Sequence, residues 1–339
     1  MKFPEQLESI IAGKDLSARA AEALLGEMAD GTLDPAQIAA VLTALRAKGE
    51  TPDEIAGFVR GMRRRMRTLR ASGTLVDTCG TGGDNSGTFN ISTTVALVLA
   101  GAGVRVVKHG NRSASSQCGS ADVLEALGVG IDLAPRTAEQ VLKEAGIVFL
   151  FAPRYHPAMK NVGPVRKALG IRTIFNLLGP FANPAGVKRQ LIGVPTPADA
   201  KQLAQVAAML GYRHALIVSS RDGLDELSIA APTDVYEVRG KSVRRFTATP
   251  EQYGLRRASL RALRGGTATQ NARIIREILS GHRGAKRDVV LLNTGAALVA
   301  AGKTTTIREG VRLAADSIDS GRASRSLVAL VTASAQGKA

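Results

Sequence analysis

The fold is decided at residues 74–84, which read TLVDTCGTGGD. The apolar start, around Leu75 and Val76, is typical of a short buried strand. The three glycines that follow let the backbone come close to a ligand without a Cβ in the way, and Asp84 supplies a carboxylate. Residues 85–94 are polar and predict the start of a helix, whose free N–H groups can hold an anion. The stretch therefore predicts a strand, a ligand-binding loop and a helix.

A second donor-rich run, Lys108 to Ser116, follows another strand-like stretch at residues 104–107. Two donor-rich loops, each placed after a strand, indicate an enzyme that binds phosphate groups. In parallel α/β sheets, ligands bind beyond the carboxyl ends of the strands, which is where both loops are expected.

Beyond residue 72, short β-rich runs alternate with helical ones, which predicts an α/β fold with a mostly parallel sheet flanked by helices. The expected strands are 75–77, 104–108, 147–151, 191–194, 215–218 and 289–292. The expected helices are 91–100, 123–127, 138–145, 198–210 and 272–279. Residues 163–186 are rich in Gly, Pro and Asn, and we expect part of this segment to pack on the N-terminal helices.

The first seventy residues show helical spacing of apolar side chains throughout. The expected helices are 3–11, 18–28, 38–45 and 55–69. Asp34-Pro35 and the capping box at 51–54 mark two helix starts. In the last helix one apolar stripe is predicted, made of Ile55, Val59, Met62, Met66 and Leu69. The chain is therefore expected to divide into a small all-helical domain, residues 1–70, and a large α/β domain, residues 73–339.

Composition excludes several classes of protein. No stretch of the 339 residues combines the length and apolarity of a membrane span, and residues 1–5 lack the apolar core of a signal peptide. Two cysteines, Cys79 and Cys118, indicate a reducing compartment, and we interpret them as small packing residues rather than redox or catalytic thiols. The histidines and cysteines show no spacing typical of a zinc site.

The net charge of +16 comes from two basic segments. Residues 239–287 hold thirteen Lys and Arg against Glu251 and Glu277, and residues 60–70 hold six Arg and no acid. Such segments indicate either contact with nucleic acid or a solvated basic face that attracts anionic substrates. The chain has no Trp and little aromatic interleaving for base stacking, which favours the second interpretation.

The phosphate-binding motifs of other folds are missing. There is no Gly-Lys-Ser/Thr pair, and Gly80-Thr81-Gly82 lacks the third glycine of a dinucleotide site. Asp225 and Glu226 follow the expected strand at 215–218 and are suitable Mg²⁺ ligands. Taken singly, Asp84 and Asp122 could cap helices, and Asp225-Glu226 could form a solvated turn. Their joint appearance at strand ends favours a shared site.

Together these residues resemble the anthranilate phosphoribosyltransferases, which join anthranilate to phosphoribosyl pyrophosphate in tryptophan biosynthesis. The resemblance extends over nearly the whole chain in order and spacing. The similar segments are 80–84, 90–93, 108–112, 119–122, 156–159, 166–180 and 224–226. It implies a nucleoside phosphorylase/phosphoribosyltransferase-like fold whose larger domain binds phosphoribosyl pyrophosphate.

The resemblance also implies roles for individual residues. The phosphoribosyl pyrophosphate site would contain Gly80, Gly83, Asp84, Thr88, Asn90, Ile91, Ser92, Thr93, Lys108, His109, Gly110, Asn111, Arg112, Ser113, Ala114, Ser115, Ser116 and Ser120. Anthranilate would contact Gly80, Asn111 and Arg166. Two Mg²⁺ ions would be held by Ser92, Asp225 and Glu226. One departure is visible at Gln117-Cys118, where relatives often carry a basic and a small polar residue.

The chemistry of such a transfer fits the residues. Bond breaking at the anomeric carbon gives an oxocarbenium-like transition state, and the main task is to stabilise the departing pyrophosphate. Mg²⁺ and fixed donors do this without proton transfer. The nucleophile is an aromatic amine, neutral at pH 7, so no catalytic residue beyond the binding residues is expected. Arg166 can fork onto the substrate carboxylate, and His109 and His156 could line the aromatic slot.

Two alternatives stay open at this point. The first is a pyrimidine nucleoside phosphorylase-type enzyme, which shares the architecture but has different glycine and lysine motifs. The second is a non-catalytic nucleic-acid-binding relative, which should have lost the elements at 80–84 and 225–226. By resemblance we expect a cytoplasmic homodimer formed through the helical domains, with no membrane partner and no nucleic-acid partner.

Overall fold

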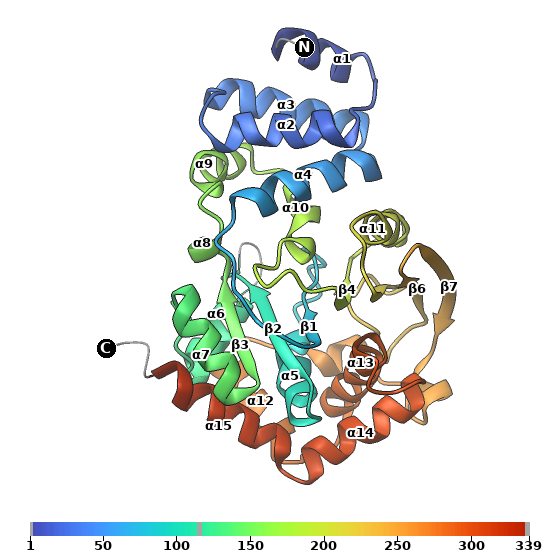
Figure 1. Ribbon diagram of the computed structural model, residues 1–339. Coiled ribbons are helices and arrows are strands. Elements are labelled where there is room, and N and C mark those ends of the chain that lie inside the picture. Colours follow the sequence, from blue (N-terminus) through green and yellow to red (C-terminus); the bar gives the residue numbers. More distant parts are fainter. Residues whose placement is uncertain (1–2, 114–116, 336–339) are drawn as a thin grey trace.

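A computed structural model describes residues 3–113 and 117–335 of the chain. It has a small helical part above a larger α/β part (Figure 1). The helical part begins with α1 (Phe3–Ile11), α2 (Ala18–Ala29), α3 (Pro35–Lys48) and α4 (Pro52–Arg65). The predicted starts are confirmed, because Asp34 and Thr51 each accept a hydrogen bond from the third residue of their helix. The two-part α/β fold predicted from the sequence is therefore confirmed.

The last of these helices is shorter than predicted. α4 ends at Arg65, and Met66 has extended backbone angles, with φ −80° and ψ 153°. The stripe expected to reach Leu69 is therefore wrong beyond Met62. Tertiary hydrogen bonds replace helical ones here, since Arg67 N donates to Tyr155 O at 2.8 Å and Leu69 N to Pro184 O at 3.1 Å. Leu69 is buried in the core of the α/β part instead.

Two later helices belong with the N-terminal ones. They are α9 (Met159–Leu169) and α10 (Phe175–Leu178), followed by the short 3₁₀ helix η1 (Gly179–Phe181). Their apolar residues share one core with α1 to α4, and Figure 1 shows both beneath the blue helices. The chain thus leaves the sheet after its third strand, packs on the helical part, and returns.

The α/β part is built on a seven-stranded sheet with the order β3-β2-β1-β4-β5-β6-β7. The first five strands are parallel, β6 pairs antiparallel with β5, and β7 pairs antiparallel with β6. Their bounds are β1 (Leu75–Thr78), β2 (Arg105–Gly110), β3 (Ile147–Phe151), β4 (Arg189–Gly193), β5 (His214–Ser220), β6 (Thr233–Arg239) and β7 (Ser242–Ala248).

Helices cover both faces of this sheet. Alternate residues of β5 enter different cores: Leu216 and Val218 pack with the C-terminal helices, while Ala215 and Ile217 pack with α11 and the helical part. The remaining helices are α5 (Ile91–Gly101), α6 (Ser120–Leu127), α7 (Pro135–Ala145), α8 (Ala152–Tyr155), α11 (Pro197–Met209), α12 (Ala268–Leu279), α13 (Ala285–Ala301), α14 (Ile307–Asp319) and α15 (Arg322–Ala335), with 3₁₀ turns η2 (Pro250–Tyr253) and η3 (Leu260–Leu263).

Two strand predictions differ from the structure. Residues 289–292, predicted as a strand, lie inside α13. A short apolar run does not distinguish a buried strand from a fully buried helix, and α13 is buried along most of its length. β6 and β7 were not predicted, because their sequences are rich in charged and hydroxyl residues.

The strand order places the ligand loops. β1 pairs with β2 on one side and with β4 on the other, so the chain reverses its direction of travel across the sheet at β1. Crevices at such switch points, outside the carboxyl ends of the strands, are where ligands bind in α/β sheets. The loop at residues 79–90 leaves β1 at this point. Within the described residues, no helix has the length and apolarity needed to span a membrane.

Several arginines of the basic segments form ion pairs. Glu237 accepts from His214, Arg239 and Arg244, and Asp234 pairs with Arg221 and Arg245. In the first segment, Arg64 pairs with Glu22 and Arg65 with Asp30. Acids from other parts of the sequence thus neutralise part of the positive charge of these segments.

Candidate active site

A cavity of about 1020 Å³ lies at the carboxyl end of the sheet, facing the helical part. It is lined by every site residue predicted above that the structure describes, from Gly80 to Glu226. Ala114, Ser115 and Ser116 lie outside the described residues. A cavity of this size is at the upper end of the range for small-molecule sites, and it can accommodate two substrates.

Packing explains Gly80. A Cβ at this position would lie 2.9 Å from the carbonyl oxygen of Gly193 and 3.0 Å from Oδ2 of Asp225. The next residue, Thr81, donates its N–H to the same carbonyl at 2.9 Å. The loop is therefore fixed against the end of β4 and the Asp225 segment. Gly83 has φ +83°, a backbone conformation that favours glycine.

Three carboxylates meet beside this loop. Burial and the charge of Asp84 raise the pKa of Asp225 to about 7. Burial and the charge of Asp225 raise the pKa of Glu226 well above its ordinary value. Oδ2 of Asp84 is buried without a hydrogen-bond donor among the described residues. Acidic groups held this close together and largely out of water fit a cation, and the solvated-turn interpretation of Asp225-Glu226 is wrong.

The donor set fits Mg²⁺ in particular. Hard cations take carboxylate oxygens, and Mg²⁺ in proteins often uses one or two carboxylates together with substrate phosphates. Within the described part of the chain, no group of three or more His, Cys, Asp or Glu side chains is placed to hold a metal alone. Phosphate oxygens of a bound substrate would complete the coordination.

Lys108 lies next to these carboxylates. It is 3% exposed, and its Nζ donates to the carbonyl of Thr78 at 2.6 Å and to Oγ of Ser92 at 3.3 Å. Its charge lowers the pKa of Glu226 and so opposes the effect of burial. In the first turn of α5, the buried hydroxyl of Thr93 has no hydrogen-bond partner among the described residues. An ammonium, hydroxyls and a helix N-terminus form a site for phosphate groups.

Asp77 was not predicted as a site residue, although a single acidic residue inside an apolar strand can indicate a buried functional group. It is fully buried, and burial raises its pKa to about 6 while Lys108 opposes the rise. Its carboxylate accepts from Asn183 Nδ2 at 2.8 Å, from Thr78 N at 2.7 Å and from His109 N at 3.3 Å. Asp77 therefore holds the end of β2 and with it Lys108.

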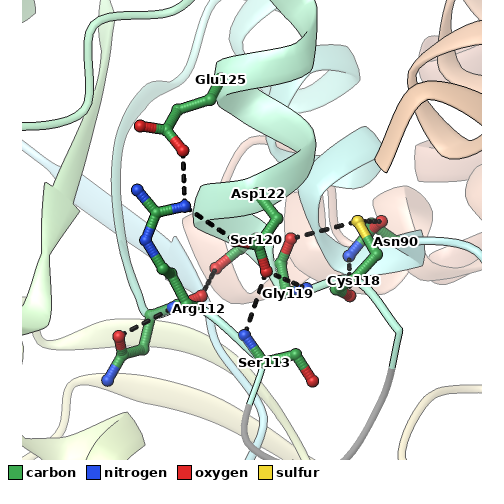
Figure 2. A network of polar contacts seen from close by, with 9 residues as sticks. Asn90, Arg112, Ser113, Cys118, Gly119, Ser120, Asp122 and Glu125 are labelled. Carbon is green, nitrogen blue, oxygen red and sulfur yellow. Dashed lines mark hydrogen bonds and ion pairs between the residues drawn. The ribbon is translucent and has the colours of Figure 1, made fainter. Parts of the chain in front are cut away.

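The loop after β2 is tied to α6 (Figure 2). Asp122 accepts from the N–H groups of Gly119 at 2.8 Å and Ser113 at 3.1 Å, so the capping interpretation of Asp122 is confirmed. Arg112 donates to both Asp122 and Glu125, and these acids raise the pKa of Arg112. Asp84, in contrast, caps no helix and instead accepts from Ser86 N at 3.3 Å.

Two buried histidines form one wall of the cavity. Nε2 of His109 lies 3.1 Å from Nε2 of His156, and Nδ1 of His109 lies 3.3 Å from the carbonyl oxygen of Gly179. Burial lowers the pKa of His109 to about 3 and that of His156 to about 4. Both rings are therefore neutral at pH 7, which suits an aromatic slot better than a proton-transfer site.

Arg166 lies on α9 at the side of the cavity formed by the helical part. Its guanidinium carbon is 5.3 Å from the ring centroid of Phe175, and burial lowers its pKa. A half-buried guanidinium gains from an anionic ligand, because the ligand offsets the cost of its desolvation. The fork geometry of Arg suits a carboxylate.

Several lining residues come from a segment that the sequence did not single out. They are Arg264, Gly265, Gly266, Gln270 and Asn271, just before and at the start of α12. The Gly265-Gly266 pair and the capping residues after it were a signal for a loop at a helix start, but nothing in the sequence placed this loop against residues 87–89.

Comparisons with known proteins agree with this geometry. Residues 4–66 match the family described as "Glycosyl transferase family, helical bundle domain", and residues 72–324 the "Glycosyl transferase family, a/b domain". Anthranilate phosphoribosyltransferase of Thermomicrobium roseum is 54% identical over 94% of this chain and 92% of its own length. That of Symbiobacterium thermophilum is 55% identical over 95% and 94%.

Solved structures give the same result. Anthranilate phosphoribosyltransferase from Thermus thermophilus is 43% identical, with TM-score 0.92 over 96% of this chain and 98% of that one. The enzyme from Saccharomyces cerevisiae in complex with PRPP and Mg is 28% identical, with TM-score 0.91 over 98% of both chains.

The fold and the site thus define an enzyme of the glycosyltransferase type, with a helical-bundle domain and an α/β domain. Within that class, the chain belongs to the anthranilate phosphoribosyltransferase family.

Proposed function

We propose that this protein transfers the phosphoribosyl group of phosphoribosyl pyrophosphate to the amine of anthranilate. The products would be N-(5-phosphoribosyl)anthranilate and pyrophosphate, in a step of tryptophan biosynthesis. The observation that carries the proposal is a single cavity lined by Asp225, Glu226 and Lys108 as well as by the half-buried Arg166. Such a cavity offers a metal–pyrophosphate site and a carboxylate site together.

At the pyrophosphate end, Ser92, Asp225 and Glu226 would hold two Mg²⁺ ions. When bound, Mg²⁺ would neutralise the negative charge that develops on the departing pyrophosphate. Lys108, the hydroxyls of Ser92 and Thr93, and the N-terminus of α5 would bind the phosphate oxygens. The rest of this substrate would be enclosed by Gly80, Gly83, Asp84, Thr88, Asn90, Ile91, residues 109–116 and Ser120. Arg112 would reach it only by leaving at least part of its pairing with Asp122 and Glu125.

At the anthranilate end, Arg166 would bind the substrate carboxylate, with Gly80 and Asn111 against the ring. The yeast relative has been solved in complex with 4-fluoroanthranilate. The neutral His109 and His156 offer an aromatic wall but only a weak base. An aniline nitrogen is a nucleophile without deprotonation, so this wall is sufficient for attack on an oxocarbenium-like carbon.

We also propose that the protein is a cytoplasmic homodimer joined through its helical domains, by resemblance to the family. The dimer proposal is tested by sedimentation of the purified chain. A mass of one chain at micromolar concentration would contradict it.

The function is tested by following anthranilate fluorescence in the presence of phosphoribosyl pyrophosphate and Mg²⁺. Loss of fluorescence that requires all components is expected. Phosphorolysis of thymidine without any anthranilate consumption would instead indicate a pyrimidine nucleoside phosphorylase-type enzyme. No anthranilate loss at any enzyme concentration would overturn the proposal.

A further inference from the structure

Asn271, on the first turns of α12, joins two loops that are far apart in the sequence. It is 2% exposed. Its Nδ2 donates to Oδ1 of Asn90 at 2.9 Å, and its Oδ1 accepts from the N–H of Gly266 at 2.8 Å. Both loops line the main cavity. The amide nitrogen of Asn271 bonds to one loop and its amide oxygen to the other. This buried side chain therefore fixes the position of the two loops relative to each other.

The first partner, Asn90, is the residue before α5. In this position asparagine usually caps its own helix, but here its side chain forms no such bond. Its Nδ2 donates instead to the carbonyl of Cys118 at 3.0 Å, and its Oδ1 accepts weakly from the thiol of Cys118 at 3.4 Å (Figure 2). The same Oδ1 accepts from Asn271. Asn90 thus links the start of α5 to the loop before α6.

The second partner is the segment 263–266, which pairs with residues 87–89 in an antiparallel manner. Phe89 N donates to Leu263 O at 3.1 Å, and Gly265 N donates to Gly87 O at 3.0 Å. A Cβ at Gly265 would lie 2.7 Å from both Oδ1 of Asn271 and the backbone N of Phe89. The backbone of this segment is therefore packed directly on the chain that enters α5.

We infer that Asn271 is a positioning residue for the phosphoribosyl pyrophosphate site, acting through Asn90. The inference rests on the proposed function of the cavity. The N–H groups and hydroxyls at the start of α5 bind phosphate only if the helix enters at a fixed angle, and misplacement by about 1 Å is costly in such sites. Without the Asn271 amide, Asn90 keeps only a thiol donor on Oδ1, and Gly266 loses its acceptor.

The first test is the Asn271→Ala variant. We expect its KM for phosphoribosyl pyrophosphate to rise about tenfold, the effect of losing two buried hydrogen bonds. The KM for anthranilate, measured at saturating phosphoribosyl pyrophosphate, should change less than about twofold. Affinity for magnesium pyrophosphate, measured by calorimetry, should fall about tenfold as well. Because calorimetry needs no turnover, it tests the inference even if the wild-type chain fails to consume anthranilate.

A double-mutant cycle tests the route through Asn90. If Asn271 acts through Asn90, then Asn90→Ala together with Asn271→Ala should weaken pyrophosphate binding no more than Asn90→Ala alone. Additive losses would contradict this route. If Asn271→Ala fails to fold, as judged by circular dichroism, Asn271→Ser carries the same tests, because a serine side chain is too short to reach both Asn90 and Gly266.

Ser334→Ala is the matched control. Ser334 is also fully buried, and its hydroxyl accepts from a loop N–H, that of Gly130, at 2.9 Å. It does not line the main cavity. This variant should lower the melting temperature and leave both KM values unchanged. The inference is overturned if Asn271→Ala behaves like Ser334→Ala, with lower stability but wild-type pyrophosphate affinity.

Discussion

At the scale of single residues, several buried or partly buried charges lie around the main cavity. Asp77, Lys108 and Glu226 are buried, and Asp225 and Arg166 beside the same cavity are partly buried. Burying a charge is costly unless a partner compensates. Lys108 and Asp77 are compensated within the protein, whereas Asp84, Asp225 and Glu226 repel one another. A bound cation would stabilise these three carboxylates, because its positive charge would offset their mutual repulsion.

This repulsion predicts how stability depends on pH. The pKa of Asp225 is raised to about 7, against about 4 in an unfolded chain. At this group the folded protein then holds more protons than the unfolded one between these values, so the contribution of Asp225 to the free energy of unfolding should fall as pH rises through this range. The lowered pKa values of His109 and His156 act in the opposite direction. Above the pKa of Asp225, Mg²⁺ should bind the ionised carboxylates and raise the melting temperature.

Thermal unfolding of the metal-free protein at about pH 5 and about pH 8, with and without Mg²⁺, measures both effects. Relative to the wild type, the Asp225→Asn variant should be less stable at about pH 5 than at about pH 8, because only the wild type has the proton of Asp225 to lose, and it should lose most of the stabilisation by Mg²⁺. If the melting temperatures of wild type and variant changed identically with pH and Mg²⁺, Asp225 would neither have a raised pKa nor bind the metal.

Arg166→Ala should raise the KM for anthranilate strongly. A lost charge-assisted hydrogen bond is worth about 1.5–3 kcal/mol, or roughly a factor of 10 to 150. Arg166→Lys keeps the positive charge but not the forked pair of donors. Its KM for anthranilate should therefore lie between those of the wild type and Arg166→Ala. Steady-state kinetics with anthranilate as the varied substrate gives the answer, and an unchanged KM would remove Arg166 from the substrate site.

At the scale of elements, the sequence predicted what local pattern controls. The unit made of β1, its glycine loop and α5 was found because the strand, the turn residues and the helix start are contiguous. The end of α4 and the nature of residues 289–292 were wrong, since tertiary hydrogen bonds and complete burial decide them. Arg264 to Asn271 could not be placed in the site from sequence, because long-range pairing with residues 87–89 brings them there.

The glycine loop gives a prediction at this scale. Gly80→Ala places a Cβ against the Gly193 carbonyl and Asp225, and the strain should cost about 1–3 kcal/mol of unfolding free energy. Gly163→Ala is the control, because a Cβ there meets no atom within 4 Å and lies in a helix, where alanine is favoured. Urea unfolding compares the two. Equal stability of both variants would mean that the loop can shift away from β4.

At the scale of the whole molecule, the helical part and the sheet part each supply one side of the cavity. The resemblance stated from the sequence anticipated both sides, because it covers nearly the full chain. The exact division at residues 70 and 73 stays a prediction. Composition predicted that part of residues 163–186 packs on the N-terminal helices, but no sequence pattern predicted that α9 would place Arg166 at the side of the cavity that faces the sheet.

The basic segments give a prediction for the surface. Because some of their arginines pair with acids such as Asp234 and Glu237, we expect no more than non-specific binding to DNA, with Kd weaker than about 1 μM at physiological salt. Fluorescence anisotropy with a labelled duplex measures this. Tighter binding together with absent transferase activity would favour the nucleic-acid-binding alternative.

The central claim is that Asp225 and Glu226 form the metal–pyrophosphate end of a phosphoribosyl transfer site. It is tested most directly by titrating Mg²⁺ while following anthranilate consumption, in the wild type and in Asp225→Asn with Glu226→Gln. We predict Mg²⁺-dependent turnover in the wild type and a loss of at least about a hundredfold in the double variant, as when a main stabilising group for a developing charge is removed. The same Mg²⁺ requirement and the same rate in both proteins would contradict this claim.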